Sequence, residues 1–146
     1  MESTIHRIGA VFTAVGLVLV LAMVDWAPAR QDVADPPPDA SAQQVVSSYL
    51  AAVNARDFST ANRLTLSSVL QFGRLDRAPS FSQIQVGQPR QDDDGSATLG
   101  TGFRESVFVP VEFVRNAETA TPTPWGYRLV RTSADAPWRI IDNGPV

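Results

Sequence analysis

Apolar residues in the stretch 41–66 recur every three or four positions, which is the spacing of one face of an α-helix. The members of this first series are Val45, Val46, Tyr49, Leu50 and Val53. Positions that fall largely outside it are Gln43, Ser47, Ala51 and Asn54. Ser41 followed three residues later by Gln44 matches a capping box, so the helix is expected to begin there.

A second, shorter helix is predicted after Asp57. This aspartate is placed to cap the new first turn. Phe58, Ala61 and Leu64 again share one helical face. The chain therefore bends while keeping one apolar stripe, and that stripe needs a sheet to cover it. The following stretch, 65–79, is interrupted by glycine and proline and is expected to be a short helix or loop.

From Phe81 the period changes to two, the spacing of a β-strand. Ile84 and Val86 alternate with glutamines, and the Asp94-Gly95 pair predicts a hairpin turn. The next strand is expected to place four residues on one face: Ala97, Leu99, Thr101 and Phe103.

Three more strands are expected, over residues 107–114, 125–132 and 137–142. In the first, Val107, Val109, Val111 and Phe113 form one face. Pro110 cannot donate to a ladder, so it predicts an edge strand or a bulge. Helices followed by antiparallel strands predict an α+β domain, with the helices on one face of a curved sheet.

The amino-terminal stretch 8–24 contains seventeen residues without a charge. Its length lies between a signal-peptide core and a membrane-spanning helix. Ala27 and Ala29 would suit a signal peptidase, whereas the long run and Trp26 favour an uncleaved membrane anchor. We favour the anchor, and the alternative is secretion after cleavage. In both cases Arg7 lies on the cytoplasmic side, so the following domain is expected to be extracytoplasmic.

Three segments follow from these patterns: a membrane anchor or signal segment (1–29), a linker (30–40) and a folded domain (41–146). The linker contains three consecutive prolines and three aspartates. Proline favours extended geometry, so the linker is expected to be a semi-rigid spacer.

Composition excludes several functions. The chain has no cysteine, so it has neither a disulfide nor a thiolate metal site. Its single histidine, His6, precedes the apolar run, which removes histidine bases and metal ligands from the domain. Arginines and acidic residues balance within 41–146, so binding to nucleic acid has little electrostatic driving force. We therefore expect no metal and no cofactor.

Two stretches resemble the nuclear transport factor 2-like superfamily, which includes ketosteroid isomerases and many non-catalytic modules. They are the helical run from Val46 to Phe58 and the closing stretch from Trp138 to Gly144. The resemblance implies a cone-shaped α+β fold over 41–146. It also matches Tyr49 to the tyrosine that donates to an oxyanion in those isomerases. The acidic residue that abstracts the proton there has no counterpart in the stretch 66–75.

Three residues are candidates for a ligand pocket: Tyr49, Glu112 and Asp142. For Tyr49 we favour a role as a core residue, and contact with a ligand is the alternative. Strand alternation places Asp142 on the face of Trp138 and Ile140, where it would point toward a pocket. Asp142 also ends its strand, and completing a turn there is the favoured alternative. Glu112 lies on the opposite face of its strand from the valines, so it is expected to be exposed or at a contact. Asp57 is interpreted as a helix cap and the run Asp92 to Asp94 as a solvated turn.

No catalytic residue set is recognisable in the domain, so we do not expect an enzyme. The preferred hypothesis is a membrane-tethered extracytoplasmic domain, attached through residues 8–24, that contacts other envelope proteins of a secretion, conjugation or transport assembly. Its open sheet face would also suit a homodimer. The alternative hypothesis is a domain that binds a small apolar ligand, or acts as an isomerase, inside the cone.

Overall fold

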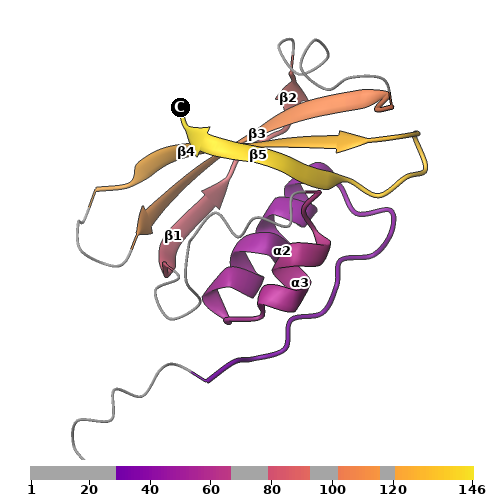
Figure 1. Ribbon diagram of the computed structural model, residues 1–146. Helices are drawn as coiled ribbons and strands as arrows, with labels where there is room; N and C mark the ends of the chain where they lie inside the picture. Colours follow the sequence, from indigo (N-terminus) through magenta and orange to yellow (C-terminus); the bar gives the residue numbers. More distant parts are fainter. Residues whose placement is uncertain (1–28, 67–78, 93–101, 116–120) are drawn as a thin grey trace, which may run out of the picture.

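The computed structural model describes residues 29–66, 79–92, 102–115 and 121–146 (Figure 1). Two helices pack against one face of a five-stranded antiparallel sheet. The predicted α+β class is therefore confirmed. The helices are α2 (Ala42–Asn54) and α3 (Phe58–Arg63). The strands are β1 (Phe81–Val86), β2 (Arg90–Gln91), β3 (Glu105–Arg115), β4 (Thr123–Arg131) and β5 (Arg139–Pro145).

The apolar run 8–24 and its predicted helix lie outside the described residues. Within the part of the chain that the structure describes, neither helix has the length and hydropathy needed to cross a membrane.

Both helix starts are confirmed. The Ser41 hydroxyl accepts a hydrogen bond from the backbone N–H of Gln44 at 3.2 Å, and the Gln44 side chain accepts one from the Ser41 N–H at 2.8 Å. Asp57 caps α3 by accepting from the backbone N–H of Thr60 at 3.3 Å. These bonds satisfy first-turn amides that have no partner within the helix.

Two polar residues of α2 bind the backbone of the edge strand β1. The Asn54 amide donates to the Phe81 carbonyl at 2.8 Å and accepts from the Phe81 N–H at 2.7 Å. Near the other end of the helix, the Gln43 amide donates to the Val86 carbonyl at 2.8 Å. The helix therefore supplies hydrogen-bond partners at both ends of the strand, and it limits what an exposed edge offers to other chains.

The core lies between α2 and the inner face of the sheet. Every member of the first predicted helical series is buried, as are Val109, Val111 and Phe113 of β3. Tyr127 and Leu129 of β4 complete this face opposite the β3 valines. The helical spacing of three to four residues therefore identified the buried face of α2. The strand spacing of two residues identified the buried face of β3, which packs against it.

Pro110 does not mark an edge strand, because β3 lies inside the sheet in the order β1-β3-β4-β5. Its carbonyl accepts from the Gly87 N–H at 2.8 Å, on the side of β3 where β1 ends and β2 has not begun. The amide nitrogen of a strand residue points to the same side as its carbonyl. The missing N–H of Pro110 thus faces this interruption, and no bond to β4 is lost.

The strand predicted around residues 97–103 is described only at its end. Residues 97–101 lie outside the described ranges, and Phe103 precedes β3 without belonging to a strand. After α3, Thr65 forms a parallel bridge with Ile140 of β5, so the beginning of the stretch 65–79 pairs with the sheet.

The linker 30–40 was predicted to be a semi-rigid spacer, but it packs on the helix pair. The Gln31 N–H donates to the Ala55 carbonyl at 2.9 Å, Val33 packs against the core, and Ala40 is buried. In Figure 1 this segment runs beside α3 before it enters α2. Charged and polar partners on the helices hold it there, and the proline pattern alone does not reveal them. The three-segment division of the chain stays a prediction.

Candidate functional site

Tyr49 is a core residue. It is 5% exposed, and its ring meets that of Tyr127 in a T-shaped contact with 5.7 Å between the ring centroids. Burial raises the pKa of Tyr49 to about 12, because the phenolate would be desolvated. The phenol is therefore neutral at physiological pH, and its principal described contact is aromatic packing.

Tyr127 is the more unusual of the two tyrosines. Its hydroxyl is fully buried and has no hydrogen-bond partner among the described residues. Burial, and secondarily the neighbouring Tyr49, raise the pKa of Tyr127 well above its usual value. An unpaired buried hydroxyl costs free energy and invites an explanation. Sequence reasoning missed this group, since strand alternation indicates only that Tyr127 faces inward.

Asp142 lies on the outer face of the sheet, so the prediction that it shares a face with Ile140 is wrong. Ile140 pairs with Leu129, but Asp142 pairs with Arg128, the residue next to Leu129 on β4. Ile141 is thus an extra residue, a β-bulge, and it shifts all following side chains to the other face. The Asp142 carboxylate lies 3.6 Å from the Arg128 guanidinium and is 59% exposed.

Glu112 is exposed on the outer face of β3, as its alternation predicted. The three pocket candidates therefore do not converge. Tyr49 lies beneath the sheet with the helices, whereas Glu112 and Asp142 lie on the opposite side. Neither candidate acid can reach the Tyr49 phenol, because the sheet separates them.

Asp92 is not solvated, in contrast to the prediction for the run 92–94. Its side chain is 8% exposed and forms an ion pair with Arg128. It also accepts a hydrogen bond from the Ser106 hydroxyl at 3.2 Å. The partners of Asp92 lie on β3 and β4, far away in sequence, so a local composition argument could not find them. Asp93 and Asp94 lie outside the described residues.

Asp57 forms the centre of a clasp that holds the amino-terminal segment. Its carboxylate accepts from the Val33 N–H at 3.1 Å and from the hydroxyls of Ser59 and Thr60 at 2.5 and 2.7 Å. The Arg30 guanidinium lies 3.1 Å away. The hydrogen bonds from Ser59, Thr60 and Val33 hold the pKa of Asp57 far below its usual range. The cap interpretation is confirmed, and the same carboxylate has a second, tertiary role.

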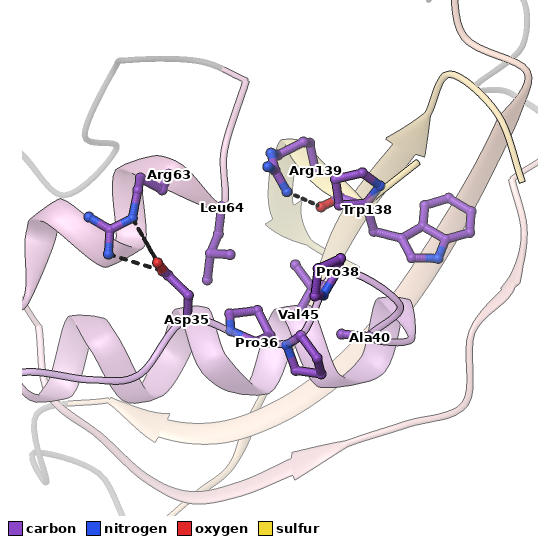
Figure 2. A pocket seen from close by; sticks show the side chains of 11 residues that line it. Asp35, Pro36, Pro38, Ala40, Val45, Arg63, Leu64, Trp138 and Arg139 are labelled. Carbon is purple, nitrogen blue, oxygen red and sulfur yellow. Dashed lines mark hydrogen bonds and ion pairs between the residues drawn. The ribbon is translucent and has the colours of Figure 1, made fainter. Parts of the chain in front are cut away.

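A pocket of about 190 Å³ opens where the amino-terminal segment meets the start of β5 (Figure 2). Its lining is largely apolar, from prolines, Ala40, Val45, Leu64 and Trp138. Asp35 and Arg63 form one side of the pocket and are paired at 3.0 Å. Arg139 also lines the pocket, and its guanidinium donates to the Trp138 carbonyl at 3.0 Å.

Sequence reasoning did not find this pocket. Its walls come from residues 35–40, from both helices and from residues 137–139. The available signals were the three consecutive prolines and Trp138, but nothing in the sequence indicates that they meet. Within the described ranges, no group of acidic and histidine side chains is arranged to hold a metal ion.

Comparison of the chain with known protein families, with curated proteins and with solved structures finds no match. The arrangement of two helices on an antiparallel sheet is what places the chain in the α+β class.

Proposed function

We propose that the chain is a non-enzymatic, membrane-tethered extracytoplasmic domain that contacts other envelope proteins as an accessory component of a secretion, conjugation or transport assembly. We also propose that it has the nuclear transport factor 2-like fold it resembles. The apolar run 8–24 supports the tether, and two helices packed on an antiparallel sheet are compatible with this fold.

The separation of Tyr49 from both candidate acids carries the proposal. A ketosteroid isomerase, the enzyme type that the sequence resembles, needs a proton-abstracting acid and an oxyanion donor around one substrate. Here the phenol packs in the core, and Glu112 and Asp142 are exposed on the other side of the sheet. These polar side chains therefore suit a contact surface better than a shared reaction site.

Site-specific photo-cross-linking in intact cells tests this function. A photoreactive residue at Glu112 reports on the outer sheet face, and one at Ser47, exposed on α2, is the matched control on the helical layer. We expect a cross-link from position 112 to a defined envelope protein in the membrane fraction, reproduced from the partner's side. A product with a second copy of the chain would identify the homodimer. Recovery of the chain in the cytosol, or no product from position 112, would contradict the proposal.

The unpaired Tyr127 hydroxyl favours a second candidate, a domain that binds a small apolar ligand or acts as an isomerase through its interior. The discriminating assay is turnover of a β,γ-unsaturated ketone by the wild type and by Tyr49→Phe. We expect no turnover by either protein. Turnover that depends on the Tyr49 hydroxyl would establish the interior as an active site.

A further inference from the structure

We propose that the pocket between the amino-terminal segment and β5 binds a carboxylate attached to a short apolar group, with Arg139 as the partner of the carboxylate. This site is separate from the outer sheet face and from the interior around Tyr49. The inference does not depend on the proposed function.

The first argument is the state of Arg139. A guanidinium has five N–H donors in a planar fork that matches a carboxylate. Among the described residues, Arg139 has one hydrogen-bond partner, the main-chain carbonyl of Trp138 at 3.0 Å. Arg63, on the same pocket, already forms hydrogen bonds from two of its nitrogens to Asp35 at 3.0 and 3.2 Å. Among the described residues, Arg139 is thus the lining cation that no carboxylate pairs with, and its remaining donors can bind an incoming anion.

The second argument is charge. The lining contains two guanidinium groups and one carboxylate, so the pocket has an excess of one positive charge. The Asp35 carboxylate is neutralised by Arg63, with which it pairs at 3.0 Å. An anion is therefore attracted toward Arg139. Because the surrounding walls are apolar, an ion pair there is screened less than one in open solvent.

The third argument is the size and lining of the cavity. The volume of about 190 Å³ is far larger than the roughly 10–15 Å³ that one enclosed water molecule needs, so the cavity has room for a small molecule of a few carbon atoms. Val45, Leu64 and Ala40 are buried residues that offer apolar contact, and Trp138 also lines the pocket. The Trp138 ring is held from elsewhere by Arg131, whose guanidinium lies 4.5 Å from the ring centroid. A fixed apolar wall beside one available guanidinium fits a short-chain carboxylate.

Two sources supply this chemistry: a free short-chain carboxylic acid, and the carboxyl terminus of a peptide that ends in a small apolar residue. Both place one carboxylate on Arg139 and a few carbon atoms against the apolar wall. The probes must therefore include one compound of each kind, together with its uncharged amide.

The test is a titration of the full-length chain in nanodiscs, followed by the indole N–H signals of its tryptophans. Butyrate is the free-acid probe and butyramide its uncharged isostere. A tripeptide ending in a free valine carboxylate is compared with its amide. The Trp125 indole donates to Asn143 at 3.0 Å and does not line the pocket, so its signal is the internal reference.

We expect saturable movement of the Trp138 signal with butyrate, the tripeptide acid or both, and at least about tenfold weaker binding of each amide. Arg139→Gln should weaken binding by about tenfold or more. Ala40→Leu should abolish it by filling the cavity. Arg115→Gln, an exposed arginine of β3 outside the pocket, is the matched control and should bind like the wild type.

Binding to the free acid alone would identify a small metabolite as the source, and binding to the tripeptide acid alone a peptide terminus. The proposal is overturned if neither acid moves the Trp138 signal saturably at 50 millimolar or so, a range that covers weak millimolar binding. It is equally overturned if the amides bind as well as the acids, or if Arg139→Gln binds like Arg115→Gln in a folded protein. Dispersed amide spectra of the variants establish that they are folded.

Discussion

At the scale of single residues, Tyr127 presents a hydroxyl that the core does not use. It is buried beside Tyr49, and no described residue hydrogen-bonds it. Tyr127→Phe removes the unsatisfied group and keeps the aromatic packing. We expect the free energy of unfolding to rise by up to about 1 kcal/mol, measured by urea denaturation.

Tyr49→Phe is the matched control for this change, because it alters the other ring of the same contact. We expect it to change the free energy of unfolding by about 1 kcal/mol or less. A loss of more than about 1 kcal/mol for Tyr127→Phe would mean that its hydroxyl has a partner in solution, such as an enclosed water molecule.

Asp57 makes the free energy of unfolding fall at acidic pH. Its folded-state pKa is held below the usual value of 3.8 by hydrogen bonds from Ser59, Thr60 and Val33. A depressed carboxylate pKa stabilises the folded state above the unfolded pKa, and this contribution is lost as the pH falls below it. We therefore expect wild type and Asp57→Asn to differ most near pH 7 and progressively less below about pH 4. Denaturation midpoints at about pH 7 and at a series of values from about pH 4 down to about pH 2 measure this. A difference that stays the same over the whole series would contradict it.

At the scale of elements, the outer face of β4 and β5 contains two glycines in register, Gly126 and Gly144. The ring of Phe108 covers Gly126 so closely that an added methyl group would overlap it, whereas a methyl group at Gly144 meets nothing within 4 Å. The Arg90 guanidinium in turn lies 4.9 Å from the centroid of the Phe108 ring.

We expect Gly126→Ala to destabilise the domain by about 1–3 kcal/mol, because Phe108 must leave its position and its contact with Arg90. Gly144→Ala is the control and should change stability by less than about 0.5 kcal/mol. The comparison uses the same denaturant melts. Equal effects of the two substitutions would show that the Phe108 ring does not rest on Gly126.

The docked amino-terminal segment is a second feature at this scale. A fragment of residues 41–146 lacks the apolar packing of Val33 and Ala40. It also lacks two ion pairs, the one between Arg30 and Asp57 and the one between Asp35 and Arg63. We expect it to be less stable than a fragment of residues 30–146 by about 2 kcal/mol or more, the scale of one buried valine-sized side chain. Thermal melts of the two fragments decide this. Equal stabilities would mean that the segment is a free spacer, as its composition indicated.

At the scale of the whole molecule, the clasp connects the domain closely to the segment that precedes it. Arg30 and Val33 are bound to α3 through Asp57, so few residues separate the domain from the apolar run 8–24. We expect the mature protein to retain that run, because its length and Trp26 favour an anchor. Intact-mass analysis of the membrane fraction is the measurement. A soluble form beginning at Arg30 would show that the run is a cleaved signal, and export itself would still hold.

The sequence by itself determined the local elements and the core face. The capping pattern at Ser41 and Gln44, the cap at Asp57 and the inward residues of α2 and β3 were all predictable. The physical reason is that helix caps and side-chain periodicity depend on residues only a few positions apart. Such short-range rules also indicated that Tyr49 can be a core residue and that Glu112 faces outward.

Only the tertiary structure decided which residues lie together. The bulge at Ile141 moved Asp142 to the outer face, and the interruption between β1 and β2 let Pro110 lie in a central strand. The partners of Asp92 and the pocket beside Arg139 come from segments far apart in the chain. Side-chain alternation holds only while the register is regular, and it contains no information on which distant segments pack together. The pocket, which no sequence pattern indicated, therefore depends on the docking of residues 35–40 against the start of β5.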